Sequence, residues 1–253
     1  MARRLKVVFA GKVVKLVAMG ALAALAGPAL AAECGADQLG TSRTIQLPRD
    51  GALYGTQQHA ALPLEKGEVV LTFDDGPEPS GTPAVLAALA DQCVKATFFM
   101  IGEKLVGSPA LARRVVAEGH SAGLHSDTHP HLSELGAQRQ LDDLRKNQAA
   151  YQAAFGVSGP AYRFPYLEET PTMLAALKAA KITVMSIDLG INDWLPDDTT
   201  EVLTARLAES LAKTGRGIIL MHDANGPTVK ALPSLLRLLK DKGYKVVHLE
   251  WEK

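Results

Sequence analysis

The chain has 253 residues, enough for one large α/β domain or two small ones with a substantial hydrophobic core. Its 27 basic and 27 acidic residues balance to a formal net charge of zero. This balance argues against nucleic acid or an anionic membrane surface as a partner, because binding to either is typical of chains with an excess of basic residues.

The start of the chain has the layout of an export signal. Basic residues come first, at Arg3, Arg4, Lys6, Lys12 and Lys15. An uncharged, largely apolar run of 17 residues follows over 16–32 and ends in small residues after a Gly27-Pro28 break. This run is shorter than the about 20 residues of a membrane-spanning helix. We therefore predict a signal peptide over residues 1–32 and a periplasmic or extracellular protein without a stable membrane partner after cleavage, with an uncleaved anchor helix as the alternative.

Residues 33–66 are rich in turn-forming residues and show little periodicity. We expect them to form an N-terminal arm that lies over the domain, with a short strand at Thr44–Leu47. Cys34 lies in this arm, and Cys93 is the only other cysteine. In an exported protein the two could form one disulfide, or they could be unrelated buried thiols, because sequence separation does not establish disulfide geometry.

From residue 67 onward, apolar and β-branched runs alternate with segments of helical periodicity. The runs predict strands at 69–73, 95–101, 121–125, 161–165, 182–188, 217–221 and 244–249. Helices are predicted at 83–92, 109–118, 134–154, 171–180, 200–213 and 228–241. Three helices begin with Thr-Pro or Ser-Pro, where the hydroxyl can cap free amides and proline sacrifices no hydrogen bond.

This alternation predicts a parallel α/β domain over 67–253, with the sheet either open or closed into a barrel. A (β/α) barrel gathers its functional residues at the C-terminal ends of the strands. Chemically capable residues lie at the ends of five of the predicted strands: Asp74-Asp75, His125, Arg163 with Tyr166, Asp188 and His222. The functional site is therefore expected at that end of the sheet.

The segment GLHSDTHPHL places His125 and His129 four residues apart, with His131 nearby. Two histidines at this spacing can bind one ion, and a carboxylate can complete the ligand set. The spacing alone also fits a polar surface loop. Combined with Asp74-Asp75 at an equivalent strand end, it favours a metal site.

Five segments resemble the successive motifs of the polysaccharide deacetylase family, the carbohydrate esterases of family 4. They are TFDDGP at 72–77, HSDTH at 125–129, RFPY at 163–166, DLGINDW at 188–194 and LMH at 220–222. The resemblance covers about residues 67–250, and KATFFMIG at 95–102 resembles the family's second strand. It implies a distorted (β/α) barrel of seven or eight parallel strands. The implied activity is metal-dependent removal of N-acetyl groups from an N-acetylglucosamine-containing polysaccharide or oligosaccharide.

The resemblance also implies a role for each matched residue. A divalent ion, usually Zn²⁺ with Co²⁺, Ni²⁺ or Mn²⁺ as alternatives, would bind Asp75, His125 and His129. Three protein ligands leave a coordination position open for water, as catalytic zinc sites do. By the same resemblance, Asp74 would be the general base and His222 the general acid, and Tyr166 would contact the oxyanion through its backbone N–H. Arg163 would pair with Asp74, and Asp188 or Asp193 would orient His222. Substrate contacts would come from Pro165, Trp194 and Leu220.

Three positions depart from the family pattern. Two extra residues separate Asp188 from Asp193, so which of them supports His222 is left open. Leu167 stands where the family often has glycine, and Asp127 where it often has a bulky residue.

Three other classes of protein fit parts of the pattern. A non-haem iron oxygenase also uses two histidines and a carboxylate, but it would leave Asp74 and His222 without a task. The same barrel could hydrolyse C–N bonds of a small amide or ureido compound. An inactive carbohydrate-binding module is the third alternative, although such a module needs no complete set of metal ligands, base and acid.

Overall fold

The computed structural model describes residues 34–195, 198–224 and 226–252. The predicted signal peptide, residues 1–32, lies outside the described residues. Within the described part of the chain, every helix is too short or too polar to cross a membrane.

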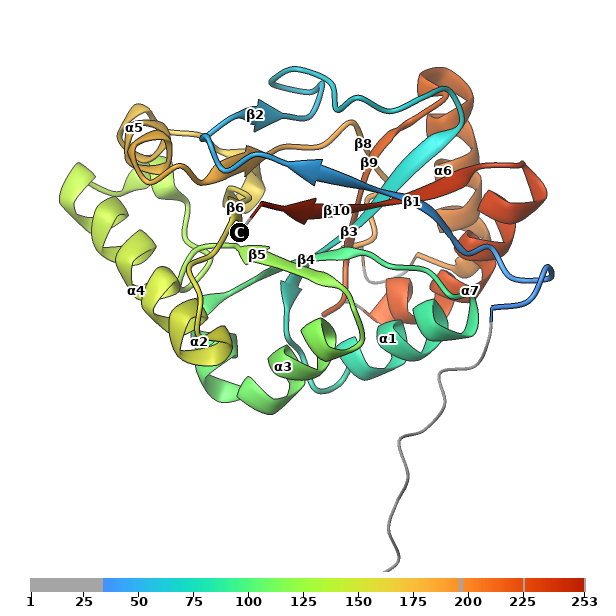
Figure 1. The fold of residues 1–253 in the computed structure, drawn as a ribbon, viewed down its shortest axis with the longest axis horizontal. Helices are drawn as coiled ribbons and strands as arrows, with labels where there is room; N and C mark the ends of the chain where they lie inside the picture. The colour runs from blue at the N-terminus through green and yellow to red at the C-terminus, as the bar shows by residue number, and fades with distance from the viewer. Residues whose placement is uncertain (1–33, 196–197, 225, 253) are drawn as a thin grey trace, which may run out of the picture. The chain divides into compact units, whose positions relative to one another are not determined.

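The described residues form ten strands, and all of the strand pairs are parallel (Figure 1). The strands are β1 Thr41–Leu47, β2 Leu53–Tyr54, β3 Glu68–Gly76, β4 Thr97–Met100, β5 Ser121–Leu124, β6 Ala161–Tyr162, β7 Thr183–Met185, β8 Leu189–Gly190, β9 Gly217–His222 and β10 Lys245–Trp251. Strands β3 to β7 pair in succession, β8 pairs with β9, and β9 returns to β3. Because β7 and β8 belong to one continuous segment, the ring closes through the chain itself. The predicted distorted (β/α) barrel is confirmed.

Seven α-helices occur in the described residues, and Figure 1 shows them around the outside of the strands. They are α1 Thr82–Asp91, α2 Gly102–Gly107, α3 Pro109–Ala117, α4 Ala137–Phe155, α5 Pro171–Ala179, α6 Thr200–Thr214 and α7 Gly226–Asp241, with short 3₁₀ turns η1 Leu132–Glu134 and η2 Pro165–Leu167. Of the three expected hydroxyl caps, only Thr170 accepts a hydrogen bond from its helix, at 3.3 Å from Met173 N. Thr82 instead uses its hydroxyl to bind Asp223 and the Glu78 amide.

Two predicted strands are much shorter in the structure. The segment predicted at 161–165 pairs only over Ala161–Tyr162, because Pro165 has no N–H to donate and Tyr166 turns the chain with φ of 55°. The segment predicted at 182–188 is interrupted because it changes partner. Its first part, β7, pairs with β6 and β2, and the residues directly after the predicted segment form β8, which pairs with β9.

Alternating side chains of the strands enter two separate hydrophobic clusters. One cluster contains residues of β1 and β10 together with one residue from each of five other strands: Val70, Phe99, Ala161, Met185 and Ile218. Neighbours such as Leu71, Phe98 and Ile219 belong to the larger cluster formed with the helices. This alternation directs the first set into the barrel and the second against the helices. Asp74 continues the inward row of Val70 and so reaches the barrel interior at the end of β3.

The N-terminal arm is part of the sheet rather than only a cover. The predicted strand at Thr44–Leu47 lies within β1, which pairs with β10 and extends the sheet beyond β3. A disulfide joins Cys34 to Cys93, and Arg43 makes a bidentate ion pair with Glu68, with both N–O distances 2.7 Å. Further along the arm, β2 pairs with β7. The arm thus protects the edge of β10, which would otherwise expose unpaired backbone groups.

Candidate active site

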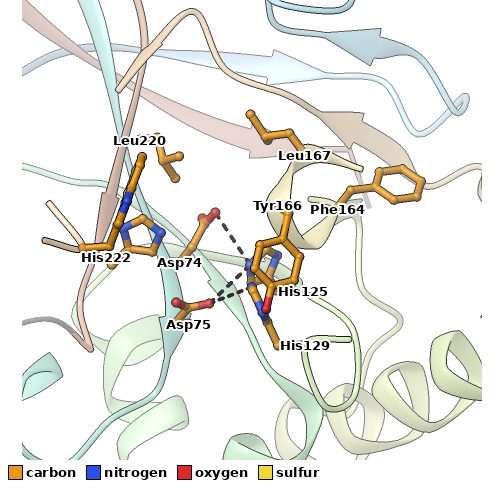
Figure 2. Close-up of a pocket in the computed structure, with 10 residues that line it drawn as sticks. Asp74, Asp75, His125, His129, Phe164, Tyr166, Leu167, Leu220 and His222 are labelled. Atoms are coloured by element: carbon orange, nitrogen blue, oxygen red, sulfur yellow. Dashed lines mark ion pairs between the residues drawn. The ribbon is translucent and has the colours of Figure 1, made fainter. Parts of the chain in front are cut away.

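A cavity of about 520 Å³ opens at the C-terminal ends of the barrel strands. Its walls contain Asp74, Asp75, His125, His129, Phe164, Tyr166, Leu167, Trp194, Leu220 and His222. Figure 2 shows the two aspartates between His222 on one side and His125, His129 and Tyr166 on the other. The structure therefore brings together most of the residues that the sequence selected.

The two adjacent aspartates face one cavity because β3 is irregular at this point. In a regular strand, neighbouring side chains point to opposite faces of the sheet. Here the register between β3 and β4 shifts between Asp74 and Gly76, and Asp75 has φ of 73°. Aspartate tolerates this left-handed conformation better than most residues. The bulge therefore turns Asp75 to the side on which Asp74 already lies.

Asp75, His125 and His129 form a compact cluster of ligand atoms, all within 4.8 Å of one another. Asp75 Oδ1 lies 3.4 Å from His125 Nε2 and 3.3 Å from His129 Nε2. His125 Nδ1 donates to the Arg163 carbonyl oxygen at 2.8 Å. That hydrogen bond fixes the ring and leaves the Nε2 lone pair directed to the cluster.

This cluster fits a divalent metal ion. Asp75 Oδ1 is buried and has no hydrogen-bond partner in the described structure, an arrangement that is costly for a polar atom. Burial alone would raise the pKa of Asp75, but the surrounding imidazoles hold it well below its usual range. An anionic oxygen and two imidazole nitrogens are a donor set typical of Zn²⁺ and related ions. The three side chains could therefore hold such a cation.

Asp74 is paired with a completely buried arginine. Arg163 Nη1 donates to Asp74 Oδ1 at 2.8 Å, and the guanidinium lies over the Phe99 ring at 4.3 Å. The Arg163 guanidinium also donates to Thr72 Oγ1 (2.7 Å), the Met185 carbonyl (3.0 Å) and the Ser186 carbonyl (3.1 Å). Asp74 Oδ2 remains on the side of the cluster, 3.8 Å from His125 Nε2. Arg163 thus compensates and orients the carboxylate while leaving one oxygen able to accept a proton.

His222 has a carboxylate partner of its own. Its Nδ1 and its backbone N–H donate to the two oxygens of Asp193, each at 2.8 Å, and the Thr228 hydroxyl also donates to Asp193. Burial alone would lower the pKa of His222. The hydrogen bond and charge of Asp193, with the charges of Asp74 and Asp75, raise the pKa to about 9. The imidazole is therefore cationic at neutral pH, and its Nε2–H can donate a proton.

The alternative support for His222, Asp188, has a different position in the structure. Asp188 Oδ1 accepts from the amide and the hydroxyl of Thr56, both at 2.6 Å, and Oδ2 accepts from Ile218 N at 2.7 Å. It therefore connects the arm to β9. The short strand β8 lies between Asp188 and Asp193, which accounts for the two additional residues in this motif.

Aromatic and apolar side chains form the mouth of the cavity. Tyr166 is 54% exposed, stacks on His131 at 3.9 Å and meets the edge of His129 at 4.6 Å. Trp194 is 53% exposed and stands edge-on to His222 at 5.9 Å. His131 is thus a support for Tyr166 rather than a fourth member of the cluster.

Pro165, expected to contact substrate, is buried and does not line the cavity. Its neighbours Phe164 and Leu167 line the cavity instead. Leu167 has φ of 58°, a conformation that favours the glycine common at this position in the family. An arm residue helps to hold this turn: Gln58 Nε2 donates to the Leu167 carbonyl at 2.9 Å, and Gln58 Oε1 accepts from Ser186 Oγ at 2.6 Å. No motif in the arm indicated this contact.

Comparison with known proteins supports the resemblance seen in the sequence. Residues 61–185 match the family described as polysaccharide deacetylase. A chitooligosaccharide deacetylase of Sinorhizobium fredii is 36% identical over 192 residues, which cover 70% of this chain and 87% of that protein. A peptidoglycan-N-acetylglucosamine deacetylase of Listeria monocytogenes is 35% identical over 182 residues, or 72% of this chain. The matched region spans only 38% of the length of the Listeria protein.

A solved structure is also similar to the fold. The peptidoglycan deacetylase of Bdellovibrio bacteriovorus superimposes with a TM-score of 0.76 at 30% sequence identity, covering 85% of this chain and 60% of that one. Sequence relatives and structural neighbours thus agree with each other and with the motifs at the cavity. The chain belongs to the polysaccharide deacetylase family.

Proposed function

We propose that this protein is a metal-dependent hydrolase that removes N-acetyl groups from an N-acetylglucosamine-containing polysaccharide or oligosaccharide. The observation that carries the proposal is the composition of one cavity. The Asp75–His125–His129 cluster, with its unpartnered buried oxygen, shares this cavity with Asp74, which is paired with Arg163, and with His222, which is paired with Asp193. Relatives named chitooligosaccharide and peptidoglycan deacetylases support the substrate class.

Asp75, His125 and His129 would hold the ion. Zn²⁺ is the best match to one carboxylate oxygen and two imidazole nitrogens, with Co²⁺, Ni²⁺ and Mn²⁺ as alternatives. Such an ion supplies Lewis acidity, which lowers the pKa of a coordinated water and polarises the acyl oxygen of the substrate.

The side chains around the cluster would carry the proton transfers. Asp74 Oδ2 accepts the proton of the attacking water, while Arg163 compensates the charge on Asp74 and prevents its rotation. His222 donates its Nε2 proton to the leaving nitrogen, since an amine is a poor leaving group without that proton. Asp193 keeps His222 cationic and correctly oriented.

Substrate contacts would come from the cavity walls. The backbone N–H of Tyr166 donates to the oxygen that becomes negative during attack on the acetamide. Trp194 and Leu220 form apolar surface for the acetyl methyl group. The exposed faces of Tyr166 and Trp194 lie where neighbouring sugar rings of a polymer could stack.

The proposed function is tested by acetate release from N-acetylchitooligosaccharides and from peptidoglycan, before and after treatment with a chelator. We expect chelation to abolish release and Zn²⁺ or Co²⁺ to restore it. Full activity in metal-free protein would contradict the proposal. Hydrolysis of small amides or ureido compounds alone would favour the small-molecule C–N hydrolase, and glycan binding without acetate release would favour the carbohydrate-binding module.

We further propose that the protein is exported to the periplasm or beyond, with a signal peptide at 1–32, an arm at 33–66 and a catalytic domain at 67–253. The Cys34–Cys93 disulfide supports this location, because disulfides persist mainly in oxidising compartments. N-terminal sequencing of the exported protein is expected to begin near Ala32 or Glu33. An intact Met1 on a membrane-bound product would favour the anchor helix instead.

A further inference from the structure

A buried carboxylate on α4 contacts the loop that carries two of the cluster residues. Asp143 is only 8% exposed, and its Oδ1 accepts a hydrogen bond from the Asp127 amide at 3.0 Å. Asp127 lies midway between His125 and His129. The carboxylate therefore reaches the backbone that separates the two imidazoles.

This loop adopts a backbone that its own residues do not favour. Ser126 has φ of 61° and His129 has φ of 58°, both in the left-handed region that is uncommon for residues other than glycine. One hydrogen bond is internal, from His129 N to Ser126 Oγ at 2.8 Å. A conformation of this kind persists only when the surrounding structure holds it.

Two neighbouring helices, α2 and α4, hold the loop. The first amides of α2, Gly102 N and Glu103 N, donate to the carbonyls of Ser126 and Asp127 at 2.9 and 3.0 Å. From α4, Asp143 accepts the amide of Asp127. In the part of the chain that the structure describes, the backbone of residues 126–129 forms one hydrogen bond with a side chain outside the loop, and that side chain is Asp143.

The burial of this carboxylate calls for a compensating contact. Removing an ionised carboxylate from water is unfavourable unless hydrogen bonds satisfy it. Burial raises the pKa of Asp143, and the adjacent Asp127 carboxylate raises it further, whereas the Asp127 amide lowers it. Aspartate at position 143 thus provides a hydrogen bond to the loop that an apolar residue could not make.

We infer that Asp143 is a positioning residue for the His125–His129 pair, which it holds at its separation through the Asp127 amide. The inference rests on the proposed function for the nature of the ion that the pair binds. Its consequence is specific: loss of the acceptor at position 143 weakens metal binding by about 10–100-fold, the range typical for residues that orient metal ligands.

The test compares two neighbouring aspartates of the same helix. Asp142 is partly exposed and pairs with Arg145 on the surface of α4, so Asp142→Ala is a matched control for Asp143→Ala. Affinity for Zn²⁺ and Co²⁺ is measured by competition with a chromophoric chelator, on metal-free protein shown to be folded by circular dichroism. The absorption spectrum of the Co²⁺ form reports the ligand geometry separately from affinity and from activity.

We expect weaker binding and an altered Co²⁺ spectrum in Asp143→Ala, and wild-type values in Asp142→Ala. Asp143→Asn keeps an acceptor oxygen and is expected to retain most of the affinity. If Asp143→Ala does not fold, Asp143→Leu removes the acceptor while keeping a side chain of similar size. Equal affinity in Asp143→Ala and Asp142→Ala would overturn the inference, as would Asp143→Asn binding as weakly as Asp143→Ala. Wild-type protein that binds neither ion would refute the proposed function as well.

Discussion

The charge state of His222 depends on Asp193, and this dependence predicts a shifted pH profile. The pKa of His222 is about 9, so about 90% of the imidazole is protonated at pH 8. In Asp193→Asn the raising effect of this carboxylate is lost, so the pKa of His222 falls from about 9 towards its ordinary value, while the charges of Asp74 and Asp75 still raise it. At the ordinary value of about 6.5, about 3% of the imidazole would be protonated at pH 8.

A proton donor is active below its pKa and inactive above it, so the alkaline limb of the rate profile moves to lower pH in the variant. The loss is up to about 30-fold at pH 8 from protonation alone and becomes smaller towards pH 6. The assay is kcat for acetate release against pH, on an N-acetyl substrate and on an activated ester whose leaving group needs no proton. The difference is expected to vanish on the ester.

Asp188→Asn is the control, because Asp188 contacts Thr56 and Ile218 rather than His222. Its alkaline limb is expected to coincide with that of the wild type. An unshifted limb in Asp193→Asn, or an equal shift in both variants, would refute the reasoning.

Three further predictions concern the buried arginine, the arm and the disulfide. Arg163→Met leaves Asp74 buried without its partner and is expected to lower the free energy of unfolding by roughly 3–5 kcal/mol in denaturant titrations; unchanged stability would contradict the pairing. Gln58→Ala removes the contact with the Leu167 turn and is expected to raise KM more than it lowers kcat, whereas the neighbouring exposed Gln57→Ala leaves both constants unchanged. Cys34 and Cys93 are expected to resist alkylation in the oxidised protein until it is reduced, and free thiols there would exclude the disulfide.

The general architecture could be predicted because its signals are local. Apolar runs and helical periodicity located the main strands and helices, and the barrel rule placed the site at the strand ends. Helix α2 was missed because it has only six residues, with glycine at both ends. The split between β7 and β8 was also missed, because an exchange of strand partners leaves no trace in hydrophobicity.

The detailed geometry of the site depends on tertiary contacts that the sequence does not display. The pattern placed Asp74 and Asp75 together, but the bulge that turns Asp75 is defined only by pairing with β4. Asp142 and Asp143 are indistinguishable as neighbouring residues of a polar helix. Only the packing of α4 against the 126–129 loop separates a surface ion pair from a buried contact.

The central claim is that one aspartate of the doublet binds a metal ion and the other accepts a proton. The most direct measurement is metal content by mass spectrometry beside acetate release, on the same samples of wild type, Asp74→Asn and Asp75→Asn. We predict that Asp75→Asn loses both metal and activity, because a poor neutral ligand replaces an anionic one. Asp74→Asn is predicted to keep the metal and lose about 10²–10⁴-fold in rate, the usual contribution of a general base. Retention of metal in Asp75→Asn with loss in Asp74→Asn would contradict the account.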